Sequence, residues 1–129
     1  MSKGRLEGKN VVVSGGAAGA GGAASEVFAR EGAHVAIVDV QEKVGVNLAK
    51  RICENQGKAF FVKGDVSLAE EVEKAVAKIN TDFDNRIDVL FNHAGTVIVK
   101  PFLETTESEW DWMMNVNVKS MFLMTRAVL

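Results

Sequence analysis

Residues 11–24 join a valine run, a glycine cluster and an alanine-rich stretch, and few folds accommodate that combination. Consecutive valines favour a strand that is buried on both faces. Gly15, Gly19 and Gly21 lack Cβ atoms, so the backbone can turn sharply there and a ligand can approach main-chain N–H groups. A helix after such a turn directs unpaired amides and the positive end of its dipole toward it. This arrangement suits a pyrophosphate, although an ordinary strand-to-helix turn in a glycine-rich chain would look similar.

An acidic residue beyond the turn supports a dinucleotide site. Asp39 closes the second apolar run and stands 20 positions after Gly19. At about that spacing a carboxylate accepts hydrogen bonds from the adenosine ribose of a dinucleotide. The sequence therefore predicts that this carboxylate and the glycine turn share one binding site.

Strand-like and helix-like segments alternate along the chain, which favours a parallel sheet with helices on both faces. The predicted strands are 10–14, 34–39, 59–62 and 87–92. The predicted helices are 19–31, 41–56, one that follows Ser67 and includes Phe83, and one from about 107 to the C-terminus. No linker or internal repeat divides the 129 residues, which match the size of one domain. We expect a single α/β domain, residues 1–129, with a doubly wound parallel sheet.

Helical spacing assigns side chains to the core. The expected apolar faces are Ala20, Ala24, Val27 and Phe28 in the first helix, Val44, Leu48 and Ile52 in the second, and Val72, Val76, Ile79 and Phe83 in the third. The last helix shows one broad face of Trp110, Met113, Met114, Asn117, Met121 and Met124, where Met and Trp at this spacing indicate core packing. Asn117 differs from its neighbours because a buried amide needs hydrogen-bond partners.

Single residues allow further predictions. Ser67 and Glu70 have the spacing of a capping box, and Thr105 or Thr106 should cap the last helix. Cys53 is interpreted as a small core residue and His34 as a surface residue.

Composition narrows the function classes. A net charge of −2 without a basic block argues against nucleic acid and anionic membranes as partners. No apolar run could span a bilayer, and residues 1–7 carry no signal core. Cys53 is the single cysteine and cannot pair within the chain, which fits a reducing compartment and a cytoplasmic location. No metal site is expected, because no His or carboxylate pattern accompanies His34.

Four motifs occur in order along the chain: Ser14-Gly15 with Gly19-Ala20-Gly21, Asp65-Val66, Asn92-His93-Ala94-Gly95, and Val116-Asn117-Val118. In this combination the chain closely resembles the N-terminal half of the short-chain dehydrogenase/reductase family over almost its whole length. The resemblance implies a Rossmann-type sheet with strand order 3-2-1-4, incomplete on its C-terminal side. It also implies a chain truncated within the helix that carries Asn117, and a fourth strand left as an apolar, unpaired edge.

The resemblance implies roles for the matching residues. The pyrophosphate of NAD would lie against the turn formed by Gly15, Ala18, Gly19, Ala20 and Gly21. The adenosine half would be held by Asp39 at the ribose, Asp65 and Val66 at the adenine, and Asn92, Ala94 and Gly95 along the adenosine side. Asn117 would resemble the family's asparagine that holds a water in the proton relay, and it is the one candidate catalytic residue here.

The chain also departs from the family pattern. Ser14 replaces the commoner Thr, Ala20 the commoner Ile and His93 the commoner second Asn, and none of these changes removes a required group. The family's chemistry uses a Ser and a Tyr-x-x-x-Lys arrangement in which the tyrosine is the general acid/base. This chain contains no tyrosine, so those roles cannot be assigned.

Three functions are considered. The leading interpretation is the cofactor-binding half of an NAD(H)-dependent oxidoreductase that interconverts an alcohol and a carbonyl. Asp39 would repel a 2′-phosphate, and we therefore expect NAD to be preferred over the phosphorylated cofactor. A second interpretation is a non-catalytic module that binds a nucleotide or a partner. A third, an S-adenosylmethionine-dependent methyltransferase, is opposed by the glycine spacing and the Asn-x-Ala-Gly motif. The helix with Asn117 resembles one commonly used for dimer contacts, so a homo-oligomer is also considered.

Overall fold

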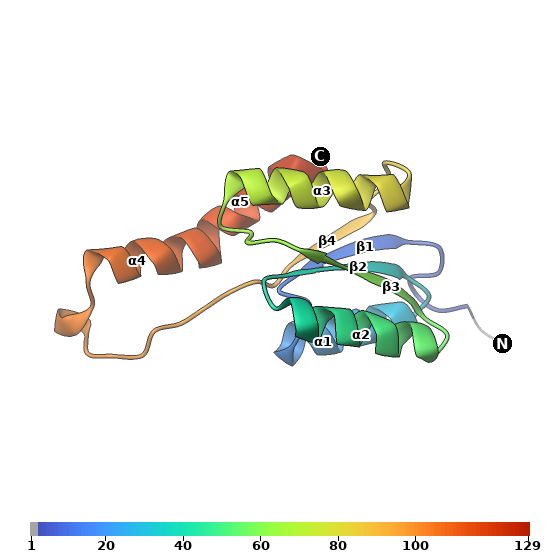
Figure 1. Cartoon of the computed structure of the whole chain (residues 1–129), viewed down its shortest axis with the longest axis horizontal. Helices are drawn as coiled ribbons and strands as arrows, with labels where there is room; N and C mark the ends of the chain where they lie inside the picture. The colour runs from blue at the N-terminus through green and yellow to red at the C-terminus, as the bar shows by residue number, and fades with distance from the viewer. Residues whose placement is uncertain (1–2) are drawn as a thin grey trace.

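A computed structural model describes residues 3–129 as an open, four-stranded parallel sheet between two layers of helices (Figure 1). The strands are β1 (Asn10–Ser14), β2 (His34–Asp39), β3 (Lys58–Lys63) and β4 (Val89–Asn92), in the order β3-β2-β1-β4. The helices are α1 (Gly19–Arg30), α2 (Glu42–Glu54), α3 (Ala69–Phe83), the short η1 (Phe102–Glu104), α4 (Glu107–Met114), η2 (Asn115–Lys119) and α5 (Ser120–Val128). The predicted fold class and strand order are confirmed, and β4 is an edge of the sheet.

The valine run of β1 forms the centre of the molecule. Val11, Val12 and Val13 each expose 0% of their surface, and β1 pairs with β2 on one side and with β4 on the other. Successive side chains point to opposite faces of a strand. Val12 accordingly packs in the core beneath α3 and α5, while Val11 and Val13 pack in the core beneath α1 and α2. Each fully buried valine contributes roughly 1.5–3 kcal/mol relative to an exposed one.

The predicted apolar face of α1 is confirmed only in part, since Phe28 packs against the core and Ala24 is half-buried. The helix buries its small residues, namely Gly21, Gly22, Ser25 and Ala29. Ala20 and Val27 are exposed instead, because α1 lies too close to the turn after β1 for larger side chains. A Cβ on Gly21 would stand 2.0 Å from the Gly15 carbonyl oxygen, so glycine is required at this crossing.

The predicted face of α2 is confirmed only in part. Leu48 and Ile52 are buried, whereas Val44 is exposed. Gly45 takes the place beside the sheet, where a Cβ would lie 2.2 Å from the ring of Phe61. The core assignment of Cys53 is wrong, since this cysteine is exposed, with its thiol 3.4 Å from the carbonyl oxygen of Ala59 in β3.

The capping box predicted at Ser67 is also wrong. Leu68 is the N-cap of α3, and its side chain makes no cap hydrogen bond. The N–H and hydroxyl groups of Ser67 bind Asp65 Oδ1 instead, at 3.0 and 2.6 Å. This Asx-type turn orients the Asp65 carboxylate. The apolar face of α3 is confirmed, with Val72, Val76, Ile79 and Phe83 all buried.

His34 is partly buried rather than a surface residue. Its ring lies edge-on to Phe60 and Phe83, with centroids 5.3 and 5.0 Å away. Burial lowers the pKa of His34, the neighbouring charge of Lys58 lowers it further, and Asp82 opposes the shift. The aromatic cluster stabilises the amino-terminal end of the sheet, opposite the carboxyl ends of the strands.

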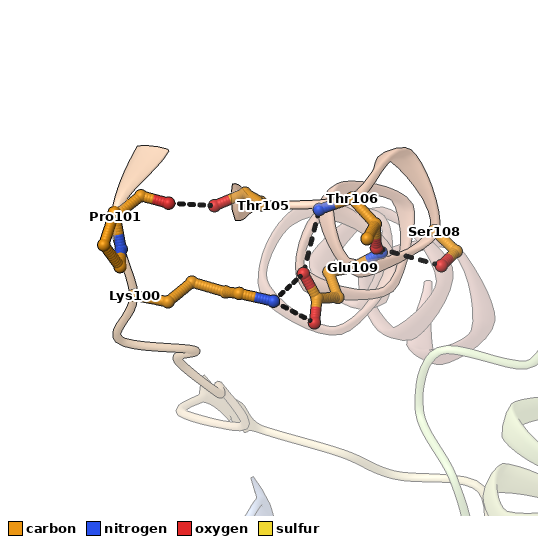
Figure 2. A network of polar contacts seen from close by, with 6 residues as sticks. All are labelled: Lys100, Pro101, Thr105, Thr106, Ser108 and Glu109. Atoms are coloured by element: carbon orange, nitrogen blue, oxygen red, sulfur yellow. Dashed lines mark hydrogen bonds and ion pairs between the residues drawn. The ribbon is translucent and has the colours of Figure 1, made fainter. Parts of the chain in front are cut away.

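After β4 the chain leaves the sheet as an extended arm that turns back at α4 (Figure 1). Thr106 caps α4 as predicted: its Oγ1 accepts from the Glu109 N–H at 3.2 Å, and Glu109 Oε2 accepts from the Thr106 N–H at 2.9 Å. Figure 2 shows Lys100 Nζ joining this group, 2.8 and 2.9 Å from the two Glu109 carboxylate oxygens. The hydrogen bond from Lys100, followed by that from the Thr106 N–H, lowers the pKa of Glu109. These local contacts fix the point where the arm becomes helical.

The predicted core face of the last helix is mostly exposed. Met124 of α5 is fully buried, but Trp110, Met114 and Met121 are exposed. The segment is divided into α4 and α5 by the π-helical η2, whose wider turn changes the side-chain register. In addition, α4 lies past the carboxyl ends of the strands, so its apolar side chains have no strand to pack against (Figure 1).

Candidate functional site

The segments that follow all four strands converge on one pocket of about 360 Å³. Ligands of open α/β sheets bind at this carboxyl end of the strands. The pocket is lined by Gly15, Ala18, Val38, Asp39, Val40, Gln41, Gly64, Asp65, Val66, His93, Ala94, Gly95, Thr96, Trp112 and Val116.

The glycine turn combines a tight crossing with an open face. Gly15 has φ +64°, and a Cβ there would lie 2.7 Å from the Cα of Ala94. Gly19 has φ +57°, but a Cβ added to it would meet nothing within 4 Å. Gly15 therefore serves the packing of the turn, whereas Gly19 keeps the backbone accessible at the start of α1.

The amino-terminal end of α1 has no side chain that neutralises it. Its N-cap is Ala18, which makes no side-chain cap bond, and the first turn contains no acidic residue. The first amides of a helix are unpaired and carry its positive dipole end. This end of α1 is thus suited to an anionic ligand.

Ser14 joins the turn after β1 to the loop after β4. Its buried hydroxyl oxygen accepts hydrogen bonds from the backbone N–H groups of His93 and Ala94, at 3.1 and 3.2 Å. The hydroxyl that the sequence retains at this position therefore fixes the loop that forms one wall of the pocket. Sequence analysis noted this hydroxyl but gave it no place in the site.

Asp39 presents a fixed carboxylate at the end of β2. The residue is only 9% exposed, yet it borders the pocket. Its Oδ2 accepts from the Ala17 N–H at 3.1 Å and its Oδ1 from the Gln41 N–H at 3.0 Å. Each carboxylate oxygen can accept a second hydrogen bond. The group is therefore held in place while it keeps capacity for a donor from a ligand.

Asp65 and Val66 form the wall that follows β3. One Asp65 oxygen, Oδ1, is occupied by the N–H and hydroxyl of Ser67. Val66 is 7% exposed, so it offers mainly its backbone and one apolar edge to the pocket. The wall thus combines a carboxylate oxygen with an apolar surface.

Asn117 lies in η2, and its side chain is hydrogen-bonded to the backbone of Thr96 in the loop after β4. The Thr96 N–H donates to Asn117 Oδ1 at 2.6 Å, and Asn117 Nδ2 donates to the Thr96 carbonyl oxygen at 2.9 Å. The amide is therefore satisfied, as its partly buried position requires. The predicted role of Asn117 in a proton relay stays a prediction.

The pocket contains part of the predicted set: Gly15, Ala18, Asp39, Asp65, Val66, Ala94 and Gly95. Gly19 and Ala20 are exposed at the start of α1, and Gly21 is buried beneath the turn. Asn92 lies elsewhere, because its Nδ2 stands 3.3 Å from Thr125 Oγ1 of α5 and it borders a separate cavity at the sheet edge.

Several lining residues were not predicted, among them Gln41, Gly64, Thr96, Trp112 and Val116. The loop residues carry no distinctive sequence signal. Trp112 and Val116 are four positions apart and immediately precede Asn117, so helical spacing could have placed them on one face near that residue.

Two classes of feature are absent from residues 3–129. No group of three or more His, Cys, Asp or Glu side chains there could hold a metal ion. None of the helices in this range combines the length and the hydropathy that crossing a bilayer demands.

Residues 9–129 match the protein-family model described as short chain dehydrogenase. Cyclopentanol dehydrogenase from Comamonas sp. (strain NCIMB 9872) is 40% identical over 126 residues, which are 98% of this chain and 50% of that protein. Short-chain dehydrogenase reductase 3c from Arabidopsis thaliana is 43% identical, over 92% of this chain and 45% of that protein.

Solved structures agree with these sequence matches. A dehydrogenase/reductase from Sinorhizobium meliloti 1021 superposes with a TM-score of 0.91 at 31% identity, over 95% of this chain and 49% of that one. The chain spans about half the length of the curated relatives it matches.

Proposed function

The chain belongs to the short-chain dehydrogenase family, and on that premise we propose that it forms the cofactor-binding half of an NAD(H)-dependent oxidoreductase that interconverts an alcohol and a carbonyl. When bound, the nicotinamide would give or accept the hydride of this reaction. One observation carries the proposal: the fixed carboxylate of Asp39 borders the same pocket as the glycine turn.

The turn after β1 fits a pyrophosphate. Gly19 leaves open space over the backbone, and the first turn of α1 offers amides without a side-chain cap or an acidic neighbour. The oxygen atoms of a dianionic pyrophosphate would accept hydrogen bonds from those amides, and its charge would interact favourably with the helix dipole. Ala18 and Ala20 would contribute backbone N–H groups rather than side chains.

The walls after β2 and β3 fit an adenosine. Asp39 would accept hydrogen bonds from the ribose hydroxyl groups, and Asp65 with Val66 would contact the adenine. A 2′-phosphate would meet the Asp39 carboxylate, and neither Gly16 nor Val40 provides a positive charge to hold it. We therefore propose NAD(H), and not its phosphorylated form, as the cofactor.

Calorimetric titration of the purified chain with NAD and NADP tests this proposal. We expect saturable binding of NAD and at least about tenfold weaker binding of NADP, a difference of about 1.4 kcal/mol. S-adenosylmethionine serves as a third ligand and should not bind. Equal affinity for the two dinucleotides would contradict the role assigned to Asp39. Absence of NAD binding would contradict the proposed cofactor.

A second candidate function is a non-catalytic module that binds a nucleotide or a partner. It is favoured by the absence of tyrosine from the 129 residues, because the family's general acid/base has no counterpart in them. Both candidate functions use the same pocket, but only the oxidoreductase turns over a substrate, so a measurement of turnover distinguishes them.

Location and assembly complete the proposal. A single cysteine fits a cytoplasmic location.

Exposed apolar side chains on α4, η2 and α5, including Met114, Val118 and Phe122, support self-association through the helical segment that carries Asn117. Sedimentation of the chain at several concentrations would test it, with a mass that stays at 13.9 kDa as the contrary result.

A further inference from the structure

Trp112 is the one aromatic side chain of α4 that borders the cofactor pocket. It stands near the carboxyl-terminal end of that helix and is 47% exposed, so part of its indole surface is open to a ligand. Trp110, two positions earlier on the same helix, is similarly exposed and does not line the pocket. The two tryptophans of the chain therefore form a matched pair, one inside the site and one outside it.

The position of Trp112 is set by the contact between Asn117 and Thr96. Two hydrogen bonds attach η2 to the loop after β4. Val116, next to Asn117, thereby lines the pocket, and Trp112 lies one helical turn before Val116. The same helix face thus brings both side chains to the site. Because α4 runs directly into η2, attaching η2 also restricts where the indole can lie.

The loop after β3 lines the same pocket as this helix face. That loop carries Asp65 and Val66, the pair assigned to the adenine in the proposed function. A flat base held there would share the pocket with the apolar edge of Val66 and the indole of Trp112.

We propose that Trp112 is an adenine-binding residue, whose indole stacks on the purine of the cofactor and closes the adenosine end of the pocket. This inference rests on the proposed function, since it assumes a dinucleotide in the pocket. Stacking between a base and an aromatic ring stabilises binding with little dependence on base identity. The ligand class at this position is therefore a purine nucleotide, and the adenosine half of the cofactor should bind without the nicotinamide half.

Single-tryptophan variants test the contact directly. Trp110→Phe leaves Trp112 as the only tryptophan, and Trp112→Phe leaves Trp110. Indole emission, excited at about 295 nm where nucleotides absorb little, is recorded while AMP or nicotinamide mononucleotide is added. We expect AMP to quench the emission of the Trp110→Phe variant and to leave that of Trp112→Phe unchanged. Nicotinamide mononucleotide should quench neither variant.

Affinity gives a second readout. Trp112→Ala should raise the Kd for NAD about fivefold or more, whereas Trp112→Phe should keep most of the affinity because it retains a ring. Trp110→Ala should change the Kd by less than about twofold. Circular dichroism melts of each variant identify any that has lost its fold, and the quenching data from the two Phe variants then decide.

The outcomes are distinct. If wild-type protein binds neither NAD nor AMP, the proposed function fails and this inference fails with it. If wild-type protein binds NAD while the emission of Trp112 does not change on addition of AMP, only the stacking contact is overturned. Quenching of Trp112 by nicotinamide mononucleotide but not by AMP would also overturn it, because the indole would then face the other end of the cofactor.

Discussion

Asn117 and Thr96, 21 positions apart, bind each other through two hydrogen bonds between a side-chain amide and one residue's backbone. Thr96 donates at 2.6 Å and accepts at 2.9 Å, so the amide mimics a neighbouring strand. The contact attaches η2 to the loop after β4. It therefore determines where Trp112 and Val116 stand relative to the pocket.

Replacing Asn117 by Ala should release η2 from the loop after β4. The Thr96 N–H and carbonyl groups would lose their partners, which costs about 1–3 kcal/mol for a partly buried polar group. We expect a lower free energy of unfolding in urea and a weaker affinity for NAD. Asn115→Ala is the matched control, because this exposed residue of the same π-helical turn makes no side-chain hydrogen bond. Similar losses in both variants would contradict the role of the contact.

Gly21 and Gly19 should separate folding from ligand binding. Gly21→Ala places a methyl group 2.0 Å from the Gly15 carbonyl oxygen and 2.6 Å from His93 Cδ2, so α1 must move. Overpacking of this kind destabilises proteins by about 1–3 kcal/mol. Gly19→Ala meets no atom and carries only the left-handed backbone penalty of about 1–2 kcal/mol.

The measurements for the glycine pair are thermal unfolding and the Kd for NAD. We expect Gly21→Ala to lower the melting temperature more than Gly19→Ala does. The Gly19 methyl group would point into the space proposed for the pyrophosphate, so this variant should lose affinity while it stays folded. A Gly19→Ala protein with wild-type affinity would show that no ligand approaches the backbone there.

Asp39 should control the choice between cofactors. Asp39→Asn removes the negative charge and keeps one acceptor oxygen, so binding of NADP should strengthen relative to NAD. Asp39→Ala should weaken NAD binding as well, and it should also destabilise the fold because the Ala17 and Gln41 N–H groups lose their acceptor. The ratio of the two Kd values measures discrimination independently of stability. An unchanged ratio in Asp39→Asn would assign discrimination to another residue.

His34 should make folding stability depend on pH. Its pKa in the folded protein is lowered, chiefly by burial and then by Lys58, below the ordinary value of about 6.5. The unfolded chain therefore takes up the proton more readily, so stability is complete above about pH 6.5 and declines as the pH falls toward the folded pKa. Urea unfolding at a series of pH values measures this decline, and His34→Gln should reduce its slope between pH 6.5 and 5. An identical slope in the variant would assign the effect to other groups.

The sequence predicted the elements better than the faces that they bury. Apolar runs bounded by turn residues located all four strands, most clearly β1 and β2, because a buried parallel strand has an obvious composition. The face of α1 was predicted only in part, because a helix that crosses a tight turn buries glycine and serine, which hydrophobic spacing ignores. The cap of α3 was missed because Asp65 competes for Ser67. Such competition depends on loop geometry that spacing does not encode.

In the candidate site, too, some residues were predicted from the sequence and others were not. Asp39 and Gly15 were predicted from a spacing that reflects the dimensions of a strand–turn–helix unit, and both line the pocket. Thr96 was missed because the extended segment after β4 leaves no pattern in the residue types. Trp112 was missed although its helical spacing to Val116, next to Asn117, indicates a shared face. Asn92 was assigned with its motif neighbours, yet strand pleating turns its side chain toward α5.

Dehydrogenase turnover should require a tyrosine, which the 129 residues lack. Reduction of a carbonyl leaves an oxygen that needs a proton, and the family to which the chain is similar in its motifs supplies that proton from a Tyr-x-x-x-Lys arrangement. Residues 1–129 contain no tyrosine, and the Asn117 side chain is engaged by Thr96. We expect this chain to bind NAD and to show no measurable dehydrogenase activity with cyclic or linear alcohols. A longer chain that adds a Tyr-x-x-x-Lys segment should be active, and Tyr→Phe in that segment should abolish the activity without changing the Kd for NAD. Steady NADH formation by the 129-residue protein, at a mass of 13.9 kDa, would show that other side chains perform the proton transfer.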